Sequence, residues 1–131
     1  MKVEMEPIGN FYTQETEIPR HWSLSEAKGR IEIDPAFQEG LQDVEEGGQI
    51  VVLFYFHNSQ RFTPDLLIQK PPHRERSFGV FSTCSPRRPN PIGLSVLRVT
   101  GVRDNVIYVE NIDMIDQTPV LDIKPHITGD S

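Results

Sequence analysis

The chain has 131 residues, of which 37% are hydrophobic, and a formal net charge of −6 at neutral pH. Its longest apolar run, residues 50–56, is too short to span a bilayer, and its acidic first residues carry no targeting signal. A single cysteine excludes an internal disulfide framework and a cysteine-based zinc cluster. We therefore expect one cytoplasmic domain, residues 1–131, with no membrane segment and no metal site.

Charge is distributed unevenly along the chain. Residues 1–50 hold eleven of the nineteen acidic residues, whereas residues 70–103 hold seven basic residues and one acidic residue. The net acidity argues against a nucleic-acid partner, but the basic span is typical of a protein with an anionic partner. On charge alone, a solvated basic face is the favoured interpretation.

Strands are predicted early in the chain. Residues 5–13 form an aromatic-rich strand in which Gly9 marks a bulge, and residues 29–33 alternate with period two, as a half-buried strand does. The polar residues 14–28 between them predict a long loop.

A short helix and a central strand follow. Asp34 is the predicted N-cap, Pro35 the first helical residue and Gly40 the terminator of one or two helical turns. Residues 49–56 are continuously apolar or aromatic and predict a central strand that is buried on both faces.

The second half of the chain continues in short strands. Their spacing and the lack of a long amphipathic helix predict an all-β barrel or sandwich. An exposed basic loop is expected at residues 70–76 and a turn at residues 104–105. The predicted strands are residues 65–68, 79–83, 93–102 and 106–110.

The polar segment Ser-Pro-Arg-Arg-Pro-Asn-Pro, residues 85–91, contains three prolines. Each proline fixes its own φ and extends the residue before it, so the segment has little conformational freedom. Arg87, Arg88 and Asn90 are therefore presented in fixed directions, which favours a binding site; a stiff connection between two strands is the alternative. Gly93, just beyond, allows either a close backbone approach or a positive φ.

Several common chemistries have no support in the sequence. Neither a dinucleotide-binding Gly-x-Gly-x-x-Gly nor a phosphate-binding Gly-x-x-x-x-Gly-Lys-Ser/Thr is present, and the four histidines are scattered singly. Cys84 with His57 as a base is a conceivable nucleophilic pair. The simpler interpretation is a small core cysteine and a strand-end histidine bonded to a carbonyl group.

Two long segments resemble the signatures of the TsaA/TrmO-like family, whose characterised members are S-adenosylmethionine-dependent tRNA adenosine N6-methyltransferases. Residues 79–95 resemble the first signature. Residues 116–125 resemble the second, Asp-Gly-Thr-Pro-Val-Leu-Asp-Ile-Lys-Pro-Tyr. Shorter matches occur at residues 7–9, 39–41 and 52–57, so the resemblance covers nearly the whole chain.

The resemblance implies an all-β fold, namely a single β-barrel domain with short helical turns and long loops, that forms a homodimer. It also implies S-adenosyl-L-methionine as cofactor and transfer of its methyl group to N6 of a modified adenosine, threonylcarbamoyladenosine, next to the anticodon of a tRNA. Arg87, Arg88 and Asn90 are then the candidates for holding the substrate nucleotide, and no general base is assigned. The cofactor-binding positions implied by the match are Pro19, Arg20, His21, His57, Asn58, Cys84, Leu94, Asp116, Gln117, Thr118 and Pro119.

Three departures from the family pattern are evident. Cys84 stands where many relatives have arginine, Gln117 replaces a glycine, and His126 replaces a tyrosine. The C-terminal domain of the longer bacterial relatives is expected to be absent. The missing domain and Cys84 leave open a non-catalytic module that binds S-adenosylmethionine. The acidic net charge leaves open a methyltransferase that acts on a small molecule.

Overall fold

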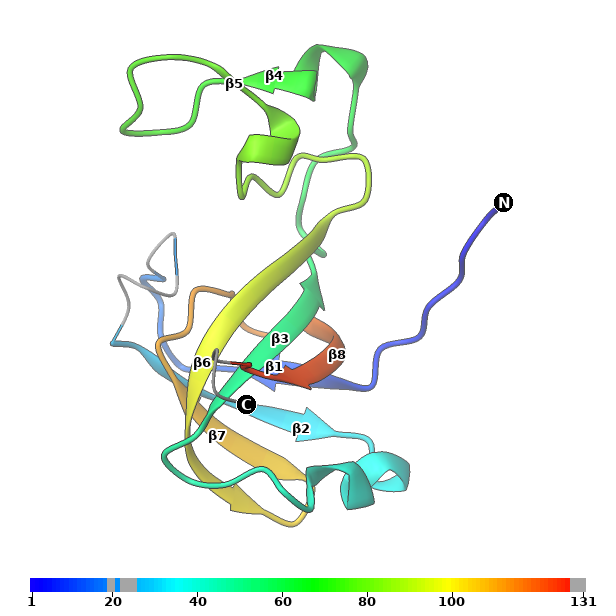
Figure 1. Cartoon of the computed structure of the whole chain (residues 1–131), viewed down its shortest axis with the longest axis vertical. Coiled ribbons are helices and arrows are strands. Elements are labelled where there is room, and N and C mark those ends of the chain that lie inside the picture. The colour runs from blue at the N-terminus through cyan, green and yellow to red at the C-terminus, as the bar shows by residue number, and fades with distance from the viewer. Residues whose placement is uncertain (19–20, 22–25, 128–131) are drawn as a thin grey trace.

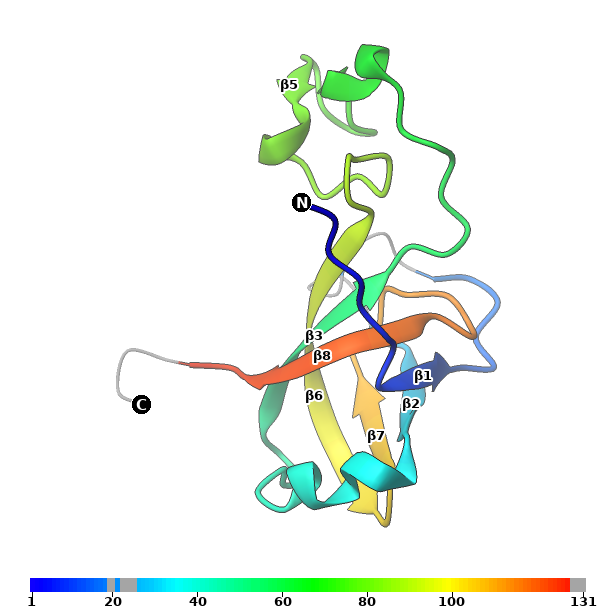
Figure 2. The same ribbon diagram turned by 90° about the vertical axis from the view of Figure 1, so that its right-hand side faces the viewer.

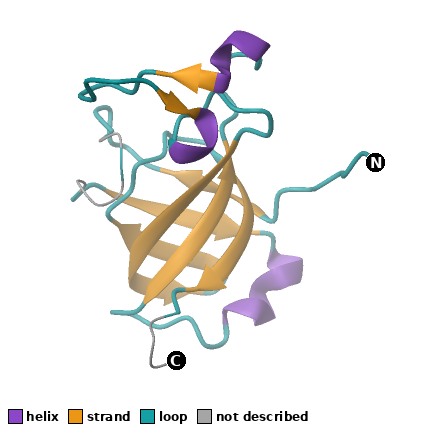
Figure 3. Cartoon of the chain, turned by 45° about the horizontal axis from the view of Figure 1, so that its top comes forward, coloured by secondary structure: helices purple, strands orange, loops and turns teal. Residues whose placement is uncertain are grey.

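The computed structural model describes residues 1–18, 21 and 26–127. Its centre is a closed antiparallel barrel with the strand order β1-β2-β7-β6-β3-β8 (Figures 1 and 3). The predicted all-β barrel is therefore confirmed. The barrel strands are β1 (Gly9–Tyr12), β2 (Lys28–Ile33), β3 (Gln49–Tyr55), β6 (Ile92–Arg103), β7 (Val106–Glu110) and β8 (Pro119–Pro125).

The barrel interior is filled by alternate side chains of each strand. On β3, Ile50, Val52 and Phe54 are buried, whereas the residues between them are only half-buried. The prediction that this strand is buried on both faces was wrong, because only one face of a barrel strand points into the core. Buried and half-buried residues therefore alternate along β3, although nearly all of them are apolar.

The short helix η2 (Pro35–Leu41) begins as predicted. The Asp34 carboxylate accepts a hydrogen bond of 2.9 Å from the backbone N–H of Ala36, and Pro35 occupies the first helical position. The helix does not end at Gly40, because the 3-10 turns continue through Leu41 and Gln42 is the C-cap.

Gly9 does not mark a bulge. It lies opposite Ile33 in regular register, and a Cβ there would lie 2.2 Å from the backbone oxygen of Glu32. Glycine at this position therefore permits close approach of β1 and β2. The register shifts fall elsewhere, between Leu53 and Phe54 and between Val99 and Gly101.

Two predicted strands were largely wrong. Residues 65–68 lie mostly in a 3-10 helix, η3 (Pro64–Leu67), which starts at a proline and in which the Thr63 hydroxyl donates to the Asp65 carboxylate. Residues 79–83 lie mostly in η4 (Val80–Ser82), where the N–H and hydroxyl of Thr83 both bond the Val80 carbonyl. These local bonds replace pairing between strands. Only β4 (Ile68–Gln69) and β5 (Phe78–Gly79) pair, as a small separate sheet.

Residues 57–91 form a long excursion between β3 and β6, which we call the arm. It contains η3, β4, β5, η4 and the proline-rich loop, and it projects beyond one end of the barrel (Figures 1 and 2). At its base, the N–H of Phe56 donates to the Pro91 carbonyl at 2.9 Å. No helix in the described part of the chain has the length and hydropathy needed to cross a membrane.

Candidate functional site

A small cavity lies where the arm leaves the barrel. Its volume is about 190 Å³, and it draws on the end of β3, the proline-rich loop and the segment between β7 and β8. Of the residues predicted to bind a cofactor, His57, Asn58 and Thr118 line it. The complete lining is Phe54, Phe56, His57, Asn58, Ser59, Pro86, Asp113, Met114, Ile115 and Thr118.

Two phenylalanines form one wall of this cavity. The rings of Phe54 and Phe56 meet edge to face, with centroids 5.1 Å apart and planes inclined at 74°. Gly93 on the neighbouring strand β6 leaves room for them, because a Cβ there would lie 2.4 Å from the Phe54 ring and 2.8 Å from the Phe56 ring. Of the two predicted roles of Gly93, the close approach is therefore the correct one; its φ is not positive.

An acidic group faces the cavity from the segment after β7. Asp113 is half-buried, and its carboxylate accepts a hydrogen bond from the hydroxyl of Ser95, a fully buried polar residue of β6. The sequence analysis missed both residues. The available signal was a serine inside the apolar first half of β6, residues 92–97, since a buried hydroxyl requires a partner.

Three other predicted residues, Asp116, Gln117 and Pro119, lie beside the cavity without lining it. The Asp116 carboxylate accepts from the N–H of Thr13 at 2.9 Å, and the N–H of Gln117 donates to the Phe11 carbonyl at 2.8 Å. Pro119 lies opposite Asn10 in the β1–β8 pair. These residues hold the seam between β1 and β8, next to Thr118, which does line the cavity.

The proline-rich loop is held by one of its own arginines. The Nη1 atom of Arg88 donates to the carbonyl oxygens of Thr83 and Ser85, at 2.9 and 3.2 Å. Arg87 and Asn90 are exposed. Of the three residues predicted to hold the substrate, two therefore extend into solvent and the third also fixes the loop.

The remaining predicted positions lie elsewhere. Cys84 is exposed on the arm, so the interpretation as a core cysteine was wrong, and it lies outside the cavity lining that contains His57. Leu94 is 54% exposed and lies on the outer face of β6. His21 is half-buried, while Pro19 and Arg20 lie outside the described residues.

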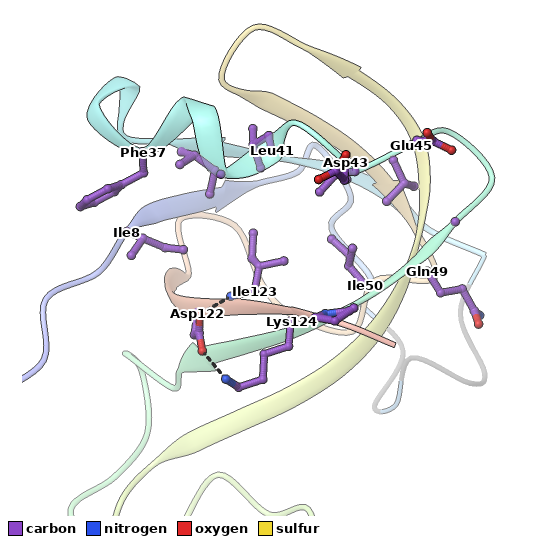
Figure 4. Close-up of a pocket in the computed structure, with 16 residues that line it drawn as sticks. Ile8, Phe37, Leu41, Asp43, Glu45, Gln49, Ile50, Asp122, Ile123 and Lys124 are labelled. Carbon is purple, nitrogen blue, oxygen red and sulfur yellow. Dashed lines mark hydrogen bonds and ion pairs between the residues drawn. The ribbon is translucent and has the colours of Figure 1, made fainter. Parts of the chain in front are cut away.

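A larger cavity of about 530 Å³ opens between η2 and β8, and none of the predicted site residues lines it (Figure 4). Ile8, Leu41 and Ile123 supply apolar surface there. Asp122 and Lys124 form an ion pair of 2.9 Å on the side of β8 away from Ile123. A catalytic site requires polar groups that converge on a common point, and this cavity has few of them. In residues 1–18, 21 and 26–127, no cluster of three His, Cys, Asp or Glu side chains could hold a metal ion.

Comparison with known proteins identifies the family. The family described as "tRNA-methyltransferase O N-terminal domain" matches residues 8–130. The chain belongs to this family. It is 37% identical over 125 residues to a probable S-adenosyl-L-methionine-binding protein of Pyrococcus abyssi, a match that covers 92% of this chain and 66% of that protein. It is 41% identical over 90 residues to the mouse tRNA (adenine(37)-N6)-methyltransferase, covering 69% of this chain and 21% of the mouse protein.

Solved structures of this family share the fold. The crystal structure of TrmO from Pseudomonas aeruginosa superposes with a TM-score of 0.76 at 34% identity, covering 97% of this chain and 57% of that one. The chain thus spans about a third to two thirds of the length of the first curated relatives it matches. A shorter relative, an S-adenosyl-L-methionine-binding protein of Archaeoglobus fulgidus, is 37% identical, and the match covers 88% of its length.

Replacing Gly93 by alanine tests the packing beneath the cavity. We expect Gly93→Ala to lower the free energy of unfolding by about 1–3 kcal/mol, because the added methyl group must displace the ring of Phe54 or the backbone. Denaturant unfolding measures the change. Gly79→Ala is the matched control, since beyond the adjacent residues no atom lies within 4 Å of a Cβ at that position. An equal loss in both variants would contradict this account of Gly93.

Replacing Gln117 by glycine tests the backbone at the β1–β8 seam. Gln117 has φ of 68°, in the left-handed region that costs a residue with a Cβ about 1–2 kcal/mol. Glycine removes this strain but loses more entropy on folding, so Gln117→Gly should raise the free energy of unfolding by about 0.5–1 kcal/mol. Gln42→Gly, at φ of −50°, is the control and should lower it. A loss of stability in both variants would show that Gln117 is not strained.

Proposed function

We propose that this chain is an S-adenosylmethionine-dependent methyltransferase domain that acts on tRNA, at N6 of threonylcarbamoyladenosine next to the anticodon. One observation carries the proposal. Three segments that resemble the family signatures, distant in sequence, meet at one cavity, to which they contribute His57, Pro86 and Thr118. The names of the Pyrococcus and mouse relatives support the cofactor and the class of substrate.

The side chains of the cavity suit this cofactor. Phe54 and Phe56 offer an aromatic wall for an adenine ring. The Asp113 carboxylate and the Asn58 amide can bind an ammonium group or ribose hydroxyls. The cofactor supplies a methyl group on a positively charged sulfur, and a nearby carboxylate is the appropriate complement to that charge. We therefore add Asp113 to the cofactor-binding residues expected from the sequence.

Positioning accounts for much of the catalysis in this proposal. Holding two reactants in the correct geometry can lower a barrier by about 7–11 kcal/mol without a strong base. Arg87 and Asn90, exposed on the loop whose Pro86 lines the cavity, hold the substrate nucleotide and its phosphate. Arg88 keeps this loop in place through its bonds to the Thr83 and Ser85 carbonyls. No side chain is assigned as the general base.

A second candidate function is cofactor binding without transfer. The Archaeoglobus protein, of which the match covers 88%, is named only for binding S-adenosyl-L-methionine. A domain of that kind would use the same cavity and the same Asp113 carboxylate. The two functions differ in whether a methyl group leaves the cofactor.

Incubation with methyl-labelled S-adenosylmethionine, total tRNA and a metabolite extract separates the candidates. We expect label in tRNA, and in methylated threonylcarbamoyladenosine after nuclease digestion. Label confined to small metabolites would indicate a small-molecule methyltransferase. Cofactor binding by calorimetry, without transfer to any acceptor, would indicate a binding module.

Asp113→Asn tests the acid of the cavity. The variant keeps the size of the side chain but removes its charge, and a hydrogen bond to a charged group contributes about 1.5–3 kcal/mol. Calorimetry should therefore show affinity for S-adenosylmethionine lowered by about tenfold or more. Asp116→Asn, measured in parallel, should have a smaller effect because Asp116 does not line the cavity. An Asp113 variant with unchanged affinity would remove this residue from the site.

We further propose that the site is completed in a homodimer. Pockets for small molecules usually enclose about 300–1,000 Å³, and this cavity encloses about 190 Å³. It is large enough for one end of the cofactor, and a second copy of the chain can supply the surface for the rest. Leu94, an expected cofactor-binding residue that is 54% exposed outside the cavity, suits a position facing a second copy.

Sedimentation with and without cofactor tests the dimer. We expect a dimer at micromolar concentration, and Leu94→Glu should weaken both self-association and cofactor binding because it places a charge in the contact. Tyr108→Glu, at an exposed aromatic residue on β7, is the control. A monomer that binds the cofactor fully would overturn the proposal.

A further inference from the structure

The arm and the barrel differ in the sign of their charge. Residues 57–91 contain six Lys and Arg residues against two acidic residues, while the rest of the chain contains seven against seventeen. The arm is therefore a cationic projection on an acidic body. It leaves the barrel at the end where the small cavity lies, since His57, Asn58 and Pro86 belong to both (Figure 2).

Two cations of the arm, Arg74 and Arg76, are held by an aromatic ring. The guanidinium groups of Arg74 and Arg76 lie over the ring of Phe78, 5.4 and 3.9 Å from its centre, and both side chains are exposed. Such stacking orients a guanidinium while leaving most of its N–H groups available for a phosphate. The Nη1 atom of Arg76 also donates to the Ser77 carbonyl, at 3.4 Å. Within the described residues, the ion pairs join barrel side chains: Arg30 with Glu32, Arg98 with Glu110, and Lys124 with Asp122.

The arm also carries an aromatic side chain that is exposed to solvent. Phe81, in η4 immediately after β5, is 79% exposed. A single exposed apolar side chain is ordinary, but the short arm exposes three, Phe81 together with Leu67 at 45% and Ile68 at 63%. Several exposed apolar groups on a cationic projection point to a ligand. Proteins that bind single-stranded RNA combine cations that contact the backbone with aromatic rings on which unpaired bases stack.

Hydrogen bonds within the arm connect its small sheet to the loop that lines the cavity. The Ser59 hydroxyl donates to the Pro86 carbonyl at 2.9 Å. The Nε2 atom of Gln69, on β4, donates to the carbonyls of Leu66 and Arg87, both at 2.7 Å. These bonds tie the small sheet to the proline-rich loop, so a molecule bound to the arm is positioned relative to the cavity at little further cost in entropy.

We propose that the arm is an RNA-binding element. The guanidinium groups of Arg74 and Arg76 contact phosphates, and the ring of Phe81 stacks on an unpaired base. The identification of the RNA as the anticodon loop of a tRNA rests on the proposed function, because that loop offers unpaired bases on both sides of the target adenosine. The rival occupant is a second copy of this chain, whose acidic barrel would also attract the arm.

Salt dependence of RNA binding tests the phosphate contacts. The intact chain is titrated, without cofactor, into a fluorescent anticodon stem-loop at several salt concentrations. Each phosphate contact contributes about one to the slope of log affinity against log salt. The double variant Arg74→Gln, Arg76→Gln should therefore reduce the slope by about two. Arg98→Gln with Arg103→Gln removes the same charge from the barrel and should leave the slope unchanged; equal effects of the two pairs would overturn the phosphate contacts.

Substitutions of Phe81 test stacking. Phe81→Ala should lower RNA affinity by roughly five- to one-hundred-fold, the usual range for loss of one stacked base, while Phe81→Trp should preserve it. Phe37→Ala is the matched control, because Phe37 is also exposed, at 53%, but lies on η2 in the barrel. Equal affinity in the Phe81→Ala and Phe81→Trp variants would overturn the stacking role.

The outcomes separate this proposal from the proposed function. RNA binding that depends on the arm, without methylation of tRNA, would support the arm and refute the enzyme. Methylation of tRNA by variants whose RNA affinity and salt slope are unchanged would refute the arm alone. Absence of RNA binding by the wild type would refute the proposal that the arm binds RNA. Arm substitutions that dissociate a dimer in sedimentation without altering RNA affinity would also refute it, because the arm would then contact a second copy of the chain.

Discussion

Strands β3 and β6 pair antiparallel over seven residues, from Gln49 opposite Arg98 to Tyr55 opposite Ile92. The arm leaves from one end of this pair and returns to it, and the bond between Phe56 and Pro91 closes its base. A connection of this length costs substantial entropy to close, and the apolar side chains of β3 in the core offset it. The cavity forms at the same end, because Phe54 and Phe56 continue the strand beneath the proline-rich loop. The positions of the cavity and of the arm thus both depend on the pairing of β3 with β6.

The difference in charge between the barrel and the arm is compatible with how each is stabilised. Closure of the barrel pairs its backbone hydrogen-bonding groups, and burial of apolar side chains stabilises it. Its stability therefore does not depend on the charge of its outer surface, which is acidic. The arm has a two-stranded sheet and few buried residues, and local bonds of Thr63, Gln69 and Arg88 hold it instead. A segment held in this way can keep its cations exposed, because its order does not depend on covering them.

The sequence predicted those parts of the fold that alternation and capping determine. Strands β2, β6 and β7 and the Asp34 cap of η2 follow from local patterns and were confirmed. The arm was not predictable in detail, since hydrogen bonds of Thr63 and Thr83 turn apolar residues with strand propensity into 3-10 helices. Of the cavity, the resemblance supplied His57, Asn58 and Thr118. Asp113 was missed because its importance depends on Ser95, eighteen residues away, which only the paired strands bring into contact.

The structure also shows the local backbone at two of the departures from the family pattern, Gln117 and Cys84. At Gln117 the backbone adopts a positive φ, as glycine readily does, although the residue is not glycine. Cys84 stands where the resemblance implies an arginine, yet the guanidinium of Arg88 bonds the carbonyl oxygens on both sides of it, those of Thr83 and Ser85. A guanidinium group therefore still binds the backbone on both sides of residue 84, although Cys84 carries no charge. The conformation of the loop thus depends on the hydrogen bonds of Arg88 as well as on the prolines.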